Sequence, residues 1–180
     1  FTQEVWIRVE DTATVEDCYK VTSLELIVNP LPVLITPAPL ELCDDNNPGD
    51  EQEAFTLEDA NDEILNGQGG ISLTYYESQF DADNAINPIV SPYTNTFNGQ
   101  TIFVRAENDT TGCYNTVTLT LRVHPNPTPT PSAQLPALEL CDAINIGDGV
   151  EVFDLTQNEI LVLNGETGVT VSYHETAAEA

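Results

Sequence analysis

Residues 101–124 read TIFVRAENDTTGCYNTVTLTLRVH, and they carry the clearest evidence for the fold class. Apolar and polar side chains alternate on both sides of a turn that contains Asn, Asp, Thr and Gly. In its second half, Val117 and Leu119 share one face, while Thr118 and Thr120 share the other. Strict alternation is typical of strands that have one face in a core and the other in water. The stretch therefore predicts two half-buried strands.

Two further strands and several short helical turns are expected before this stretch. Residues 71–75 alternate in the same way, and residues 39–43 form a first strand after a proline-rich junction. Residues 56–59 have the form of a capping box, in which a hydroxyl and an acidic side chain satisfy the first backbone donors of a helix. Residues 66–67, Asn-Gly, tolerate a positive φ and would end that helix, and residues 81–85 suggest another turn. The sum is an all-β, Ig-like sandwich with short helical excursions.

The chain repeats itself. Residues 40–44, LELCD, recur as residues 138–142 at an offset of 98, and the match continues without a gap to the last residue. The front of the chain matches another part of the unit, because residues 5–10, VWIRVE, resemble residues 102–107, IFVRAE. Self-similarity at a fixed period is typical of tandem-repeat proteins. We therefore divide the chain into the end of one repeat (residues 1–30), a complete Ig-like repeat (residues 31–126) and the opening of a third (residues 127–180).

Prolines mark both junctions between repeats. Residues 29–32 read NPLP, and residues 125–131 read PNPTPTP. Alternating proline and threonine favour polyproline II, which acts as a semi-rigid spacer. The chain opens on FTQEVW, which is typical of the middle of a domain, so we expect both ends to be cuts in a longer protein.

The charge of the chain argues against several classes of partner. Thirty acidic residues accompany only four basic ones, for a formal net charge of −26. Such a surface repels nucleic acid phosphates and anionic lipids, and no apolar run approaches the roughly 20 residues that span a bilayer. We therefore expect no nucleic acid partner and no direct membrane insertion. The composition suits an extracellular molecule at the cell surface, with divalent cations as counterions.

The four cysteines are expected to form disulfides. Wide spacing without a CxxC pair, in a chain with two histidines, argues against zinc and suits an oxidising compartment. The natural bridge within the complete repeat is Cys43–Cys113, which closes a span of 70 residues and would contribute roughly 4 kcal/mol. Cys18 and Cys141 would then pair outside the 180 residues. The alternative, Cys18–Cys43 with Cys113–Cys141, would join neighbouring repeats, and the sequence alone leaves both open.

An acidic loop after the first cysteine of each repeat is a candidate calcium site. Calcium takes about six to eight oxygen ligands, which closely spaced Asp, Asn and carbonyl groups supply. The spacing is not that of an EF-hand, and the alternative is an Asx-rich turn that leads into a helix. No other cofactor is expected. The candidate ligands are Asp44, Asn47, Asp50 and Glu53 in one copy and Asp142, Asn145, Asp148 and Glu151 in the next.

Thr12 and Thr110 are candidate sites of O-linked glycosylation. They lie in residues 11–13, DTA, and 109–111, DTT, which occupy equivalent loops of two repeats just before a cysteine. Both segments resemble the short acceptor pattern for O-glycosylation in secreted proteins of the Bacteroidota.

No arrangement of residues predicts catalysis, so we expect that the protein is not an enzyme. His174 replaces Tyr76 of the other copy, and a residue that varies between copies is a weak candidate for a general base. No pair of carboxylates stands out from the general acidity, as a glycosidase would require. An aromatic platform for glycans would have to come from Tyr75, Tyr76 and Tyr93, although alternation turns Tyr75 toward the core.

The most distinctive segments of the unit are residues 104–107, VRAE, and residues 112–114, GCY. With them, the unit resembles the repeats of very large flavobacterial surface proteins that are exported by the type IX secretion system. Those proteins include adhesins of the gliding-motility kind. The resemblance implies a stalk or filament of Ig-like modules at the cell surface, with no catalytic residues to carry over.

These observations favour a structural and adhesive role. Each repeat adds length, disulfides resist stress outside the cell, and proline junctions limit bending. The expected partners are neighbouring repeats of the same chain, other copies in a filament, and surfaces or glycans. The alternatives are a calcium- or glycan-binding module and an accessory domain of a secreted hydrolase.

Overall fold

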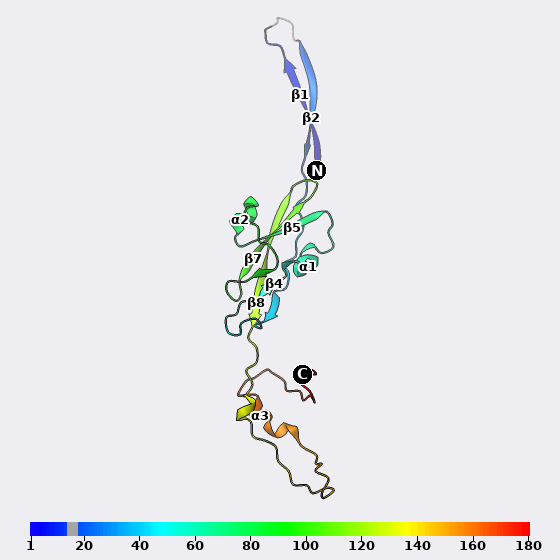
Figure 1. The fold of residues 1–180 in the computed structure, drawn as a ribbon. Coiled ribbons are helices and arrows are strands. Elements are labelled where there is room, and N and C mark those ends of the chain that lie inside the picture. The colour runs from blue at the N-terminus through cyan, green and yellow to red at the C-terminus, as the bar shows by residue number, and fades with distance from the viewer. Residues whose placement is uncertain (14–17) are drawn as a thin grey trace. The chain divides into compact units, whose positions relative to one another are not determined.

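The complete repeat is built on one four-stranded sheet. The computed structural model describes residues 1–13 and 18–180, and Figure 1 shows its ribbon. The order of the strands in this sheet is β3-β8-β7-β5. The strands are β3 (Leu40–Cys43), β5 (Ile71–Tyr76), β7 (Thr101–Asn108) and β8 (Tyr114–His124).

The two strands predicted from alternation form the centre of this sheet. β7 pairs antiparallel with both β8 and β5, whereas β3 runs parallel to β8. On β8, Leu119 and Leu121 are buried, while Thr118 and Arg122 are exposed. The inward face is therefore the one that alternation predicts, because successive side chains of a strand point to opposite faces.

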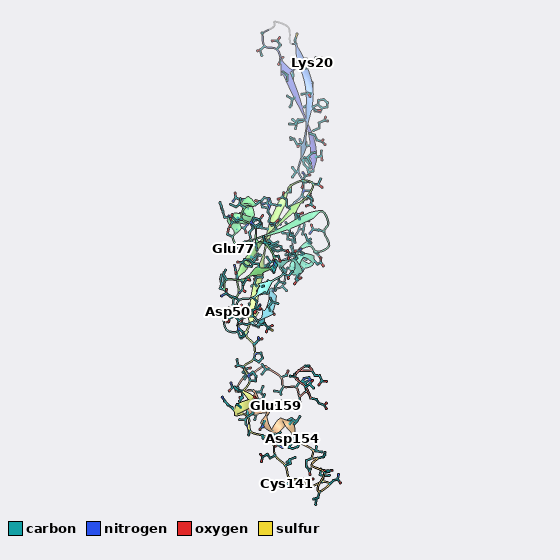
Figure 2. All side chains as sticks on the ribbon, in the orientation of Figure 1. Lys20, Asp50, Glu77, Cys141, Asp154 and Glu159 are labelled. Atoms are coloured by element: carbon teal, nitrogen blue, oxygen red, sulfur yellow. The ribbon has the colours of Figure 1, made fainter. Side chains whose placement is uncertain are left out.

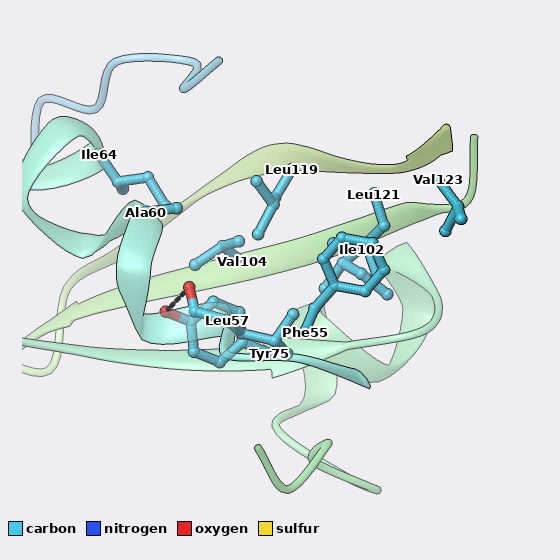
Figure 3. Close-up of a cluster of buried hydrophobic side chains, with 10 residues drawn as sticks. All are labelled: Phe55, Leu57, Ala60, Ile64, Tyr75, Ile102, Val104, Leu119, Leu121 and Val123. Carbon is cyan, nitrogen blue, oxygen red and sulfur yellow. Dashed lines mark hydrogen bonds between the residues drawn. The ribbon is translucent and has the colours of Figure 1, made fainter. Parts of the chain in front are cut away.

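A layer of short elements packs against the apolar side of the sheet. It contains β4 (Ala54–Phe55) and β6 (Tyr93–Thr94), which pair with each other. A 3-10 turn, η1 (Leu57–Ala60), leads directly into α1 (Asn61–Leu65). Figure 3 shows the side chains that these elements and the sheet bury together. The buried cluster consists of Phe55, Leu57, Ala60, Ile64, Tyr75, Ile102, Val104, Leu119, Leu121 and Val123.

The predicted helical turn forms after β4, but its cap differs. Thr56 precedes η1 without a side-chain cap hydrogen bond, so the capping-box prediction is wrong at this residue. Its counterpart in the next copy, Asp154, does cap, because its side chain accepts a hydrogen bond from the Thr156 N–H. Asn66 and Gly67 follow the helix with φ values of 47° and 78°, which confirms them as its end.

A second helix lies where a turn was expected near residue 81. α2 (Gln79–Asn84) begins after Ser78, whose side chain accepts a hydrogen bond from the Asp81 N–H. The helix contacts β5 and β7, and its Ala82 is fully buried. It therefore brings its last backbone carbonyls close to β7.

The first segment of the chain is a two-stranded hairpin. β1 (Thr2–Glu10) and β2 (Tyr19–Ile27) pair antiparallel along their whole length. By sequence they are the counterparts of β7 and β8. None of the described residues of this hairpin belongs to the buried cluster of the complete repeat. The complete repeat therefore has a core of its own.

The last segment, residues 125–180, contains only short helical turns among its secondary-structure elements. These are η2 (Ser132–Gln134), η3 (Leu155–Asn158) and α3 (Glu159–Val162), and Figure 2 shows Asp154 and Glu159 beside them. No helix in the described part of the chain has the length and apolar character that a membrane span needs.

This segment nevertheless reproduces the contacts that open the complete repeat. In each of the two segments, one backbone N–H donates to a side chain just after the helix. A second N–H, two residues later, donates to a backbone carbonyl of the helix. The offset is 95 at the donors and 98 at the acceptors, so the third segment carries a three-residue insertion between them. The pairs are Val33–Gln68 and Ile35–Ile64 in the complete repeat, and Thr128–Glu166 and Thr130–Val162 in the last segment.

The fold is mostly β with a few short helices, which confirms the sequence prediction at that level. A full opposing sheet is not formed in the described residues, because β4 and β6 have two residues each. The structure divides after His124, into residues 1–124 and 125–180.

Candidate functional site at the two ends of the repeat

The first cysteine of the complete repeat lies where the chain leaves the repeat. Cys43 ends β3 and is aligned, in parallel register, with His124, the last residue of β8. The next residue, Asp44, donates its N–H to the His124 carbonyl at 2.9 Å. Cys43 is exposed to solvent. Cys43 and His124 define what we name the downstream end of the repeat.

The second cysteine lies where the chain enters the repeat. Cys113 directly precedes Tyr114, the first residue of β8, and its carbonyl accepts from the Asn108 N–H at 2.9 Å. On the same strand, Asn115 Nδ2 donates to the carbonyl of Pro32 at 3.1 Å. The opening residues of the repeat are thereby held beside this cysteine. Cys113 and Pro32 define the upstream end.

The predicted bridge Cys43–Cys113 is wrong for this geometry. β8 has 11 residues, and a rise of about 3.3 Å per residue separates its two ends by roughly 36 Å. A disulfide needs Cα atoms within about 7 Å of each other. The two cysteines lie at opposite ends of a hydrogen-bonded strand, a relation that their positions in the sequence do not reveal. All four cysteines of the chain are among the described residues, and each is a free thiol.

A buried arginine organises the upstream end. Arg105 is only 8% exposed, and its guanidinium donates to the carbonyls of Ala82 and Asp83 in α2 at 3.0 and 3.3 Å. It also pairs with Glu107 at 2.8 Å and lies over the Tyr114 ring, 3.4 Å from its centroid. Because Tyr114 follows the second cysteine directly, this cluster fixes the backbone that carries that cysteine.

The first hairpin has the same arrangement in a more exposed form. Arg8 pairs with Glu10 at 2.7 Å and lies over the Tyr19 ring, 4.0 Å from its centroid, next to Cys18. Arg8 and Arg105 therefore each pair with a carboxylate of their own strand. The recurrence ties the arginine–tyrosine contact to the second cysteine of a repeat.

The carboxylates of the acidic loop bind the backbone of the loop itself. Asp44 Oδ2 accepts from the Gly49 N–H at 2.6 Å. Glu53, which is 5% exposed, accepts from the N–H groups of Asp45 and Asn46 at 2.6 and 2.7 Å. Side chains that bond nearby backbone N–H groups are typical of Asx-type turns. The loop is therefore a turn that its own acidic residues stabilise.

The remaining predicted calcium ligands of this loop also bond within it. Asp50, labelled in Figure 2, accepts from Asn47 Nδ2 at 2.7 Å and from the Gln52 N–H at 2.9 Å. Among the described residues, no group of three or more His, Cys, Asp and Glu side chains could hold a metal ion. The hydrogen bonds thus favour an Asx-rich turn, which is the alternative interpretation of the loop. They do not support calcium binding.

The corresponding loop of the last segment forms equivalent bonds. Glu151 accepts from two successive backbone N–H groups, and Asp142 Oδ2 accepts from the Gly147 N–H at 2.6 Å. The carbonyl of Asn145 accepts from the Asp148 N–H at 3.2 Å. The same turn forms although no strand flanks it in this segment, so its geometry follows from the local sequence.

Both threonines of the glycosylation prediction lie in exposed turns. Thr110 occupies the β7–β8 turn, where its N–H donates to Asn108 Oδ1 at 3.1 Å. Thr12 lies in the equivalent turn after β1 and is also exposed. Both hydroxyl groups are accessible to a modifying enzyme, and O-linked glycosylation stays a prediction.

The tyrosines do not form an exposed platform for glycans. Tyr75 and Tyr76 are 5% and 2% exposed, and Figure 3 shows the Tyr75 hydroxyl bonded to the Leu57 carbonyl. Tyr93 is half-buried, and its hydroxyl donates to Glu77 Oε1 at 2.9 Å. Burial raises the pKa of Tyr93. The glycan-platform alternative therefore lacks its aromatic residues.

The placement of the cysteines agrees with the comparison of the chain with protein families. Residues 39–129 and 137–180 match the Flavobacterium inter-domain disulphide bond domain family. The chain belongs to this family. The resemblance to flavobacterial repeats is thereby confirmed at the level of a flavobacterial domain, and the domain is an inter-domain structural module. The comparison with curated proteins gives no match, and the comparison with solved structures gives none either.

Proposed function

We propose that this chain is part of an extracellular, non-enzymatic stalk at the surface of a flavobacterium, built of Ig-like repeats that disulfides join end to end. The stalk projects an adhesive tip or offers many weak contacts along its length. The observation that carries the proposal is the presence of one cysteine at each end of the complete repeat. This geometry forbids a bridge within the repeat, so each of the two cysteines needs a partner in a neighbouring repeat.

The strand order supports the Ig-like part of the proposal. In an Ig-type sandwich, strands C, F and G form one sheet. β5, β7 and β8 have the corresponding order, and β3 adds to the edge in parallel with β8. The short pair β4–β6 then corresponds to the opposing sheet of the sandwich.

Charge and junction chemistry support the surface location. A net charge of −26 keeps an extended molecule soluble, and the proline-rich junctions act as semi-rigid spacers. Glycans on Thr12 and Thr110 would lie in turns that project from the strands. Type IX secretion and a role in gliding-type adhesion enter the proposal through the resemblance to flavobacterial adhesin repeats.

The location and the role are tested on intact cells. An antibody raised against the complete repeat should label cells of the flavobacterium that makes the protein without permeabilisation, and external protease should remove the label. Fab fragments of the same antibody should reduce attachment of the cells to glass, whereas Fab fragments against an unrelated surface protein should not. Labelling that requires cell lysis would contradict the surface location, and unchanged attachment would contradict the adhesive role.

A further inference from the structure

Building on the proposed function, we infer which cysteines form the bridges between repeats. The first cysteine of each repeat, Cys43 in the complete one, pairs with the second cysteine of the repeat that follows. By the same rule, Cys113 pairs with the first cysteine of the repeat that precedes. No two of the four cysteines of this chain are then partners of each other.

The two ends of a single repeat carry different cysteines. The chain enters at the upstream end, where Pro32 is bonded to the strand beside Cys113, and leaves at the downstream end, where His124 lies beside Cys43. In a tandem chain, the downstream end of one repeat continues into the upstream end of the next. Each junction therefore has a first cysteine on one side and a second cysteine on the other.

The junction is short compared with the repeat. Pro127 is the counterpart of Pro32 at the offset of 95 that the opening contacts share. Only Pro125 and Asn126 separate His124 from Pro127. Three Cα–Cα steps span at most about 11 Å. This is roughly a third of the distance along β8 that separates the two cysteines within one repeat.

The alternative pairs would join cysteines on the far sides of the junctions. Cys18 directly precedes β2, at the upstream end of its own repeat, and the nine residues of β2 separate it from the junction. Cys43 lies at the downstream end of the following repeat. A Cys18–Cys43 bridge would require two repeats to fold back along each other, which a semi-rigid proline junction opposes. A Cys113–Cys141 bridge would require the same folding back.

Each bridge forms by thiol–disulfide exchange with an external disulfide. A thiolate of one repeat attacks the oxidant disulfide and releases one thiolate of the oxidant. The thiolate of the other repeat then attacks the mixed disulfide and releases the second thiolate of the oxidant. One sulfur–sulfur bond forms between the repeats, and one breaks in the oxidant, which takes up the two electrons and the two protons as two thiols. A thiol–disulfide oxidoreductase supplies the oxidant outside the cytoplasm, and oxidised glutathione replaces it in vitro.

Apolar side chains accompany Cys43 at the downstream end. Leu42 precedes it and is 39% exposed, and Phe97 is 59% exposed. The loop of Phe97 is fixed at this end because the Asn98 amide bonds both the N–H and the carbonyl of Val123 at 2.8 Å. These apolar side chains are therefore held at the same end of the repeat as the first cysteine of the bridge.

The pairing rule is tested with two copies of residues 31–126 in tandem, since this unit contains the whole buried cluster. The informative variant keeps Cys43 of the first copy and Cys113 of the second, with Cys→Ser elsewhere. The matched control keeps Cys113 of the first copy and Cys43 of the second. In a glutathione redox buffer, the informative variant should close an intramolecular disulfide at least about 100-fold faster than the control, because a short link raises the effective concentration of the second thiol. Alkylation followed by mass spectrometry measures the remaining thiols.

The outcomes separate this inference from the proposed function. If the control closes as fast as the informative variant, or faster, the pairing rule is wrong, although disulfides still join the repeats. If no variant forms a bridge between the two copies, the proposed function fails as well. Cys43 is exposed and Cys113 is half-buried, so serine at these positions should leave the fold intact, and circular dichroism checks this.

A second measurement uses the 180-residue chain itself. After refolding in the same redox buffer and separation of the monomer, all four cysteines should be free of bridges to one another. A disulfide between any two of them within one molecule would overturn the inference.

Discussion

The molecule contains two hairpins with the same motif in different surroundings. In both hairpins, β7–β8 and β1–β2, the strands pair antiparallel and a cysteine directly precedes the second strand. Both hairpins also place an arginine over a tyrosine ring. Yet Leu121 is fully buried, whereas its counterpart Leu26 is 43% exposed. The difference comes from β3 and β5, which flank β7–β8 and have no counterpart beside β1–β2 among the described residues.

The two hairpins show which features follow from the local sequence and which features need the whole repeat. Strand pairing and the arginine–tyrosine contact form in both hairpins, so a local pattern is sufficient for them. Burial needs the first half of the repeat, which supplies the flanking strands and the helical layer. An isolated two-stranded hairpin is marginally stable at best, so stability should be concentrated in the complete repeat.

Truncation of a buried leucine should destabilise the complete repeat most strongly. Leu121→Ala should lower the free energy of unfolding of the complete repeat by about 2–5 kcal/mol, because it leaves a cavity in the core. Leu26→Ala, the matched change in the first hairpin, should cost within about 0.5 kcal/mol. Urea unfolding followed by circular dichroism measures the repeat. The single tryptophan, Trp6, lies in β1 and reports on the hairpin by fluorescence. Equal losses for the two variants would contradict the comparison.

The next prediction concerns the equivalent arginines of the two hairpins, Arg105 and Arg8. Arg105→Lys should destabilise the repeat by about 2 kcal/mol, because a lysine keeps the charge but cannot reach both α2 carbonyls and the carboxylate of Glu107 at once. Arg8, whose side chain is 51% exposed, should tolerate Arg8→Lys within about 0.5 kcal/mol. Thermal unfolding of both variants decides the point. A harmless Arg105→Lys would show that the guanidinium is not needed at the upstream end.

Much of the fold could be predicted because one face of each strand is buried. Residues 71–75, 101–107 and 116–124 alternate, and the structure has β5, β7 and β8 there. The end of the helix at Asn66 and Gly67 could also be predicted, because these two residue types adopt a positive φ more readily than most others. These features depend on neighbours in the sequence, which a single chain displays.

The candidate site could be predicted only in part. The cysteines are visible as residues, but their separation depends on the parallel register of β3 with β8, which joins segments about 80 positions apart. Asn115 was missed as the link to Pro32 because one asparagine in a strand makes no pattern. Asn95, which is buried and bonds the Glu53 N–H at 2.7 Å, was missed for the same reason. A long-range contact of a single polar residue produces no periodic pattern in the sequence.

A smaller effect should appear in the complete repeat as the pH rises. Burial, and then the charges of Glu58 and Asp59, raise the pKa of Tyr75 above its usual value of 10.0. The unfolded chain therefore loses this proton first, and stability present below pH 10 decreases as the pH rises above it. Tyr75→Phe should cost about 1 kcal/mol at neutral pH through the lost hydrogen bond, and should flatten the decline above pH 10.

The control for this change is Tyr173, the counterpart of Tyr75 in the last segment. Tyr173 is 44% exposed, so Tyr173→Phe should alter the free energy of unfolding at neutral pH by less than about 0.5 kcal/mol. Unfolding by urea at a series of pH values measures both variants. If Tyr75→Phe leaves the alkaline slope unchanged, another group is responsible for it.

Calcium should leave the melting temperature unchanged, although both copies have the acidic loop. Because Asp44 and Glu53 already bond the loop backbone, the melting temperature should be the same in calcium chloride and in EDTA. The null result is informative, since a site that is specific for the folded state would add about 2.7 kcal/mol at a calcium concentration 100 times its dissociation constant. Glu53→Gln provides the contrast: it should lower the melting temperature equally in both solutions, because it weakens bonds to the Asp45 and Asn46 N–H groups. A calcium-dependent rise that Glu53→Gln removes would instead make the loop a metal site, and the turn would then be its framework.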